Sequence, residues 1–97
     1  MKTFGNTTAD QAKDNVSDIK FWGDGDTFKL ISKAWSDDEE WMKSTKAMEI
    51  EGLGCLVQVS TQNEELVAEA LTFVAGVKLE EIKDDKGKVT GRKLVKF

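Results

Sequence analysis

The chain has no histidine, no proline and no tyrosine, and it has a single cysteine, Cys55. Without histidine, a histidine-based catalytic triad is excluded, and so is a zinc site built from histidine or from several cysteines of one chain. One cysteine cannot close a disulfide within the chain, so a disulfide framework is excluded as well. A lone thiol is typical of a reducing compartment, and we therefore expect a cytoplasmic protein.

The length and charge of the chain limit its class and its partners. Ninety-seven residues are enough for one domain with one modest core. Eighteen acidic against fourteen basic residues give a net charge of -4, which opposes loose binding to nucleic-acid phosphates or to an anionic membrane. No segment approaches the ~18 apolar residues of a membrane span, and residues 1–14 have no signal-peptide core. We therefore expect neither a nucleic acid nor a membrane as the main partner.

Residues 1–18 are polar and carry few large apolar side chains. Such a segment cannot bury enough apolar surface to offset the entropy lost on ordering it. The sequence therefore predicts a flexible N-terminal arm over residues 1–18, with one possible short helix from Thr8 to Val16, and a single β domain over residues 19–97.

The rest of the chain reads as short extended segments separated by turn residues. Cys55–Gln62 is the clearest strand, because Cys55, Val57 and Val59 alternate with polar residues. Gly23–Asp26 and Asp84–Gly87 are typical of tight turns. We predict an all-β fold, a small antiparallel meander that closes into a barrel or sandwich of five to seven strands.

Two segments also fit helices, which would make the fold α+β. Ser36 and Glu39 match a capping box, so Asp37–Met48 could be helical. Glu64–Val74 carries a helical apolar stripe as well as a strand face. We favour strands in both, because Ser44, Thr45 and Met48–Ile50 fit a strand in the first segment and Thr72–Val74 is rich in strand-forming residues in the second.

The motifs that carry catalysis or bind cofactors are absent or incomplete. Asp24 and Asp26 could begin a calcium loop, but Phe28 occupies the position of the next oxygen ligand. Gly52-Leu53-Gly54 does not lead into a helix that could bind phosphate. Cys55 lies in an apolar run, where a thiol is buried and inert. We predict no metal, no cofactor and no catalytic residue, so we do not expect an enzyme.

Aromatic residues lie next to lysines in three places: Lys20–Trp22, Lys33–Trp35 and Trp41–Lys43. Exposed rings beside cations can stack on the bases of single strands. The negative net charge instead favours tryptophans that fill the core or contact another protein. The predicted contact surface consists of tryptophans and two nearby lysines: Trp22, Trp35, Trp41, Lys43 and Lys46.

The C-terminal segment, residues 76–97, is basic, with seven basic and four acidic side chains. Its cations Lys88, Arg92 and Lys93, together with Lys43 and Lys46, suggest an alternative surface for a single-stranded nucleic acid or a small anion. The segment also fits a solvated hairpin whose lysines protect a sheet edge from aggregation. Both interpretations stay open.

Two segments, Lys20–Phe28 and Trp41–Glu49, resemble short proteins of unassigned role from tailed bacteriophages. The resemblance covers roughly residues 19–75, and no mechanism is attached to its motifs. It implies expression in the cytosol of an infected bacterium. Small acidic phage proteins of this kind often bind a host or phage protein, and an alternative role is a virion component that decorates the head.

These observations together predict a non-catalytic binding module that engages another protein. A small sheet has exposed edges, and exposed edges favour pairing between copies. We therefore also expect a homodimer or higher homo-oligomer, formed through an edge strand or a tryptophan-bearing face.

Overall fold

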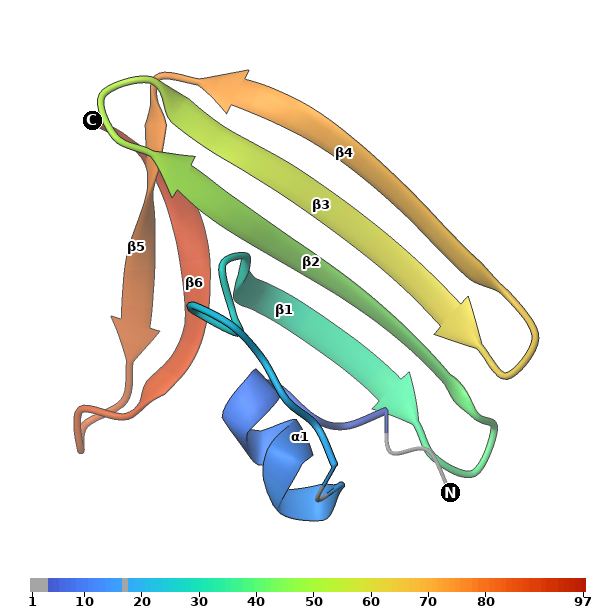
Figure 1. The fold of residues 1–97 in the computed structure, drawn as a ribbon. Helices are drawn as coiled ribbons and strands as arrows, with labels where there is room; N and C mark the ends of the chain where they lie inside the picture. Colours follow the sequence, from blue (N-terminus) through green and yellow to red (C-terminus); the bar gives the residue numbers. More distant parts are fainter. Residues whose placement is uncertain (1–3, 17) are drawn as a thin grey trace.

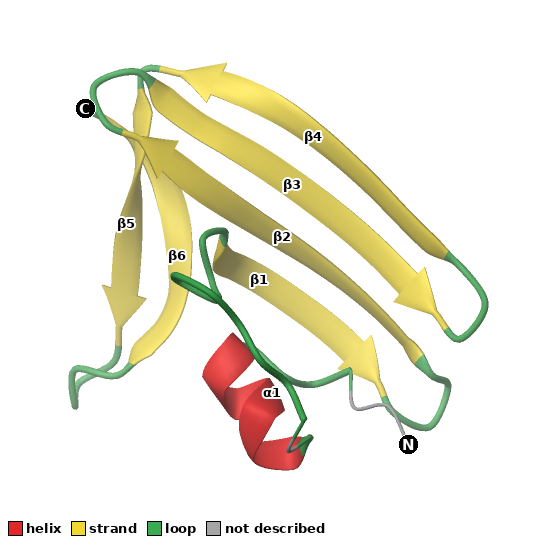
Figure 2. Cartoon of the chain, viewed as in Figure 1, coloured by secondary structure: helices red, strands yellow, loops and turns green. Residues whose placement is uncertain are grey.

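The computed structural model describes residues 4–16 and 18–97, and over these residues it contains one short helix and six strands (Figures 1 and 2). The strands form a four-stranded sheet in the order β1-β2-β3-β4 and a two-stranded sheet of β5 and β6, and every pairing is antiparallel. The predicted all-β meander is therefore confirmed. The elements are α1 (Ala9–Asn15), β1 (Lys29–Ser36), β2 (Trp41–Ile50), β3 (Gly54–Asn63), β4 (Val67–Ala75), β5 (Val77–Lys83) and β6 (Val89–Lys96).

The larger sheet is curved, and the β5–β6 hairpin stands across one of its ends (Figure 1). Gly76 makes the bend between β4 and β5 with a φ of 73°, a conformation that glycine adopts without strain. The hairpin approaches β3 at Cys55, whose Sγ lies 3.6 Å from the carbonyl oxygen of Val77.

The alternative helix over Asp37–Met48 is wrong, although its start signal is real. Ser36 Oγ accepts a hydrogen bond from the Glu39 amide at 3.1 Å, as in a capping box. Glu40 then takes a positive φ of 59°, which ends the turn before a helix can form. Strand β2 follows, and it is paired on both sides, with β1 and with β3. Pairing along two neighbours outweighs a local helix signal.

The alternative helix over Glu64–Val74 is also wrong. Asn63 Oδ1 accepts hydrogen bonds from the amides of Glu65 and Leu66 at 2.9 and 2.8 Å. This side-chain turn closes the β3–β4 loop, and the chain returns as β4 along the whole length of β3. The strand interpretation is therefore confirmed for both ambiguous segments.

Helix α1 lies within the Thr8–Val16 window that the sequence indicated, and Thr8 caps it by accepting from the Gln11 amide. The described part of the predicted arm contacts the rest of the molecule, because Phe4 is only 6% exposed and the Ala9 amide donates to the Asp26 carboxylate. Residues 1–3 and 17 of the arm lie outside the described residues.

The core is small. Among the described residues, the buried apolar side chains are those of Phe4, Ala47 and Cys55. Many larger apolar side chains stay exposed, above all along β4. Within residues 4–16 and 18–97, no helix has both the length and the apolar character that crossing a bilayer requires.

Candidate functional site

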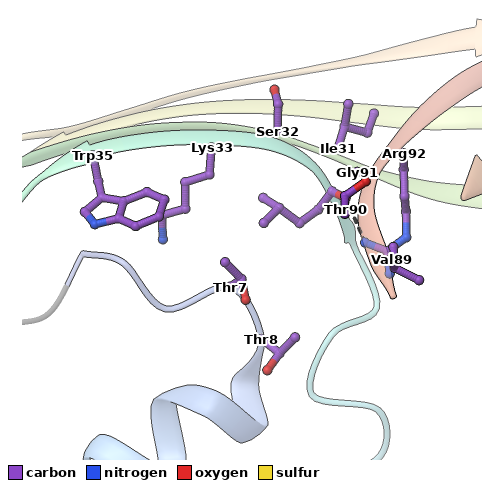
Figure 3. A pocket seen from close by; sticks show the side chains of 11 residues that line it. Thr7, Thr8, Ile31, Ser32, Lys33, Trp35, Val89, Thr90, Gly91 and Arg92 are labelled. Carbon is purple, nitrogen blue, oxygen red and sulfur yellow. Dashed lines mark hydrogen bonds between the residues drawn. The ribbon is translucent and has the colours of Figure 1, made fainter. Parts of the chain in front are cut away.

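A pocket of about 350 Å³ lies between the N-terminal segment, β1 and β6. This volume is within the range of small-molecule sites. Figure 3 shows Lys33 and Trp35 extending from β1 toward the segment that carries Thr7 and Thr8, with β6 at the other end. The polar and aromatic residues that line the pocket are Thr7, Thr8, Ser32, Lys33, Trp35, Thr90 and Arg92, and of these the Ser32 side chain points to the other face of β1 (Figure 3).

A bulge in β1 shapes one end of this pocket. Leu30 pairs with Lys46, but the next pair is Ser32 with Thr45, so Ile31 is an extra residue on β1. A bulge bends its strand and increases the local twist. The bend brings β1 against β6, where the carbonyl oxygen of Ile31 faces Gly91.

Lys33 is the cation on the β1 side of the pocket. Its Nζ donates to the carbonyl oxygen of Asn6 at 2.7 Å. Burial lowers the pKa of Lys33 below its ordinary value of 10.5, the positive charge of Lys46 lowers it further, and Asp37 acts in the opposite direction. The ammonium group is therefore incompletely solvated and has a second cation nearby, so an added negative charge would be stabilised there.

Lys46 lies on the same face of the sheet, because Lys33 pairs with Ser44 and side chains two apart on a strand share a face. It lines an adjoining pocket with Asn6 and Asp26. In the part of the chain that the structure describes, no carboxylate lies within 4.0 Å of the ammonium group of Lys33 or Lys46. Positive charge therefore collects on this face of an acidic protein.

Arg92 is the cation on the β6 side. Its Nη1 donates to the carbonyl oxygen of Leu30 at 2.8 Å, and its Nη2 lies 3.4 Å from the Glu81 carboxylate. The side chain is 22% exposed. A guanidinium group has five N–H donors, so donors remain for a ligand after these two contacts.

Trp35 supplies the aromatic wall, and the N-terminal segment passes close to its ring. A Cβ placed on Gly5 would lie 2.7 Å from the indole Nε1, so only glycine allows this approach without displacement. The Trp35 residue is still 44% exposed. An apolar or flat part of a ligand could contact this exposed surface.

The five predicted contact residues do not form one surface. Trp35 and Lys46 belong to the face of the sheet on which the N-terminal segment packs and the candidate pocket lies. Trp41 pairs with Asn63 and Lys43 with Thr61, which places both on the opposite face of the sheet. Trp22 is 97% exposed in the loop before β1. Only part of the predicted set is therefore brought together.

Of the alternative cations, only Arg92 lines the pocket. Lys88 lies at the β5–β6 turn, where its amide donates to Asp84, and the exposed Lys93 has its Nζ 3.9 Å from Glu80 Oε1.

Sequence reasoning missed Lys33 as a site residue, although the Lys33–Trp35 run was noted. It also missed Thr7 and Thr8, because nothing in the polar N-terminal segment indicated that this segment packs against the sheet.

The lining supplies cations, hydroxyl groups and one aromatic ring, a set suited to holding an anion. Among the described residues, no carboxylate and no thiol lines this pocket. No group of three or more His, Cys, Asp or Glu side chains in residues 4–16 and 18–97 could hold a metal ion. The cations and hydroxyl groups of the lining could hold a negatively charged group.

Comparison with known proteins places the chain in one family. No curated protein and no solved structure matches it. The model of the Lockin family matches residues 1–95, which include α1, both sheets and every residue of the pocket. Because the match covers nearly the whole sequence, the chain belongs to the Lockin family.

Proposed function

We propose that this Lockin family member is a non-catalytic binding protein that holds a small anionic ligand in the pocket between the N-terminal segment, β1 and β6. One observation carries the proposal: Lys33 and Arg92 line the same pocket, and no carboxylate lines it among the described residues. Lys46 adds positive charge next to it. The whole chain has a net charge of -4, so this positive site is local.

The chemistry of the lining defines the ligand class. Arginine and lysine are the usual partners of phosphate and carboxylate groups, and the threonine hydroxyls can donate to the same oxygens. Leu30 and Trp35 offer apolar contact beside the cations. The ligand is therefore a small organic phosphate or carboxylate with an apolar or ring-shaped part. A long nucleic acid fits less well, because the rest of the protein repels its charge.

Phenyl phosphate is a suitable probe, because it combines a phosphate with one ring. We expect binding by calorimetry that weakens with added salt. Lys33→Met should weaken it about tenfold, since a charge-assisted hydrogen bond is lost. Lys46→Met should have a smaller effect, because Lys46 lines the adjoining pocket.

Lys43→Met is the matched control, because Lys43 is an exposed lysine on the opposite face. It should bind phenyl phosphate as the unmodified protein does. Equal losses in Lys33→Met and Lys43→Met, or no loss in either, would overturn the pocket as the site. Circular dichroism of each variant separates lost binding from lost folding.

A second candidate function is contact with a protein partner through Trp22. This side chain is 97% exposed, and a large exposed ring is typical of an interface anchor. Together with the phage resemblance, it supports an accessory protein that engages a host or phage protein in the bacterial cytosol. Trp22→Ala should abolish such contact with the fold intact. Mass spectrometry of purified particles would test the virion alternative.

A further inference from the structure

Strand β4 forms one edge of the larger sheet and is the most exposed strand of the described chain. Its apolar side chains Val67, Leu71 and Phe73 are 60%, 57% and 48% exposed. These three alternate along the strand, so they share one face. An apolar edge strand of this length is a template for pairing with another strand.

Among the described strands, none pairs with the outer side of β4, so the backbone groups on that side are available for pairing. The Asn63 amide bonds the Leu66 carbonyl at one end of the β3–β4 ladder, and the Gly76 amide bonds the Leu53 carbonyl at the other. In an antiparallel ladder, hydrogen-bonded residues alternate with residues whose N–H and C=O point away. The even-numbered residues of β4 therefore bond β3, and the odd-numbered residues from Val67 to Ala75 point their backbone groups outward.

The exposed area of the single chain is too large for a molecule of its mass. A folded 10.8 kDa monomer exposes roughly 5,500 Å² by the usual scaling, whereas this chain exposes 7188 Å². The radius of gyration, 14.4 Å, also exceeds the roughly 12.5 Å expected for this length. The excess of roughly 1,600 Å² is more than the ~800 Å² that each partner buries in a standard stable interface.

We propose that two copies of this chain pair through β4, antiparallel and about a two-fold axis at Leu71, so that the two larger sheets become one continuous sheet. Leu71 is the central residue of β4, and its outward backbone groups would bond those of Leu71 in the second copy. The apolar side chains of the two edge strands would then lie on one face of the joined sheet.

The charges along β4 are compatible with antiparallel pairing of two identical strands. The symmetric register places Glu69 opposite Phe73 of the second copy and not opposite its own equivalent. The acidic loop residues Glu64 and Glu65 lie at one end of β4, and Lys78 follows the other end. Antiparallel pairing brings opposite ends together, so Glu64 and Glu65 of one copy approach the end at which Lys78 of the other copy follows β4.

The test is the mass of the protein in solution and its change on substitution. We expect the full chain to sediment at twice 10.8 kDa at micromolar concentration. Leu71→Lys should raise the dimer dissociation constant about 100-fold, because two like charges would meet across the axis. Leu53→Lys is the matched control: this leucine is 62% exposed in the β2–β3 turn, and its variant should remain dimeric.

Hydrogen exchange of the full chain tests the same pairing without any substitution. The amides of Ala68, Ala70 and Thr72 bond β3 and should be protected at every concentration. The amides of Glu69 and Leu71 should become protected only as the dimer forms. A monomer at all concentrations, an assembly larger than two chains, or an unchanged dimer in folded Leu71→Lys would each overturn the proposal.

Discussion

Arg92 Nη1 donates to the carbonyl oxygen of Leu30 over 2.8 Å, and this bond ties the β5–β6 hairpin to the bulge of β1. The two residues are 62 positions apart in sequence, so the bond joins the first strand of one sheet to the last strand of the other. It also closes one wall of the candidate pocket. The pocket therefore requires the hairpin to be docked against β1.

Replacing Arg92 should destabilise the protein as well as the pocket. We expect Arg92→Ala to lower the free energy of unfolding by about 2 kcal/mol, because a hydrogen bond from a charged donor is lost at a partly buried position. Urea denaturation measures this. Lys93→Ala is the control, with an expected change below about 0.5 kcal/mol, since its ion pair with Glu80 is exposed and long. Similar losses in both variants would contradict the role given to Arg92.

The pH dependence of stability should report on Lys33. Because burial and Lys46 lower the pKa of Lys33 in the folded protein, the folded state loses this proton at a lower pH than the unfolded chain. The unfolded state then binds more protons in the window below 10.5, so stability rises with pH there. Lys33→Met lacks this contribution. Urea denaturation at several pH values should show that the free energy of unfolding of the unmodified protein rises relative to that of the variant as pH approaches 10.5. A difference that stays constant with pH would contradict the assignment.

The fold could be predicted from local patterns where those patterns agree with the pairing. Cys55, Val57 and Val59 alternate in β3 as the sequence indicated, and the Asp84–Gly87 turn closes the β5–β6 hairpin. The capping-box hydrogen bond at Ser36 does form, yet a strand follows it. The local signal therefore predicted the hydrogen bond correctly and the secondary structure wrongly, because pairing with β1 and β3 makes β2 a strand.

The candidate site was much harder to predict. Lys33 and Arg92 meet only because a one-residue bulge bends β1 and the hairpin docks against it. Neither event has a sequence signature of its own. Gly5 gave no signal either, although its lack of a side chain lets the N-terminal segment approach Trp35. Residues that are brought together by docking of separate elements cannot be grouped from their order in the chain.

Glu40 combines an unfavourable backbone conformation with an unfavourable charge. Its φ is 59°, and a hydrogen bond with Glu64 raises the pKa of Glu40 above its ordinary 4.5, with burial and the like charge adding to the shift. We expect Glu40→Gly to raise the urea midpoint most, because it removes both the backbone strain of a non-glycine residue at positive φ and the repulsion from Glu64. Glu40→Gln should raise it less, because it removes only the charge.

The same position makes a pH prediction. With its pKa raised, folded Glu40 binds more protons than the unfolded chain just above pH 4.5, so this group destabilises the protein increasingly as pH rises through that window. The advantage of Glu40→Gln should therefore grow from acidic to neutral pH. An advantage of equal size at low pH would show that charge is not its origin.

The three tryptophans should separate into different classes on substitution. Trp22→Ala should change the free energy of unfolding by less than about 0.5 kcal/mol, because the ring is 97% exposed and has little packing to lose. Trp41→Ala should cost about 2 kcal/mol, because this ring is half-buried on β2 between β1 and β3. Trp35→Ala should both lower stability and weaken phenyl phosphate binding. Denaturation and calorimetry on the same three variants distinguish these outcomes, and a Trp22 variant that unfolds would show that its loop packs against the protein.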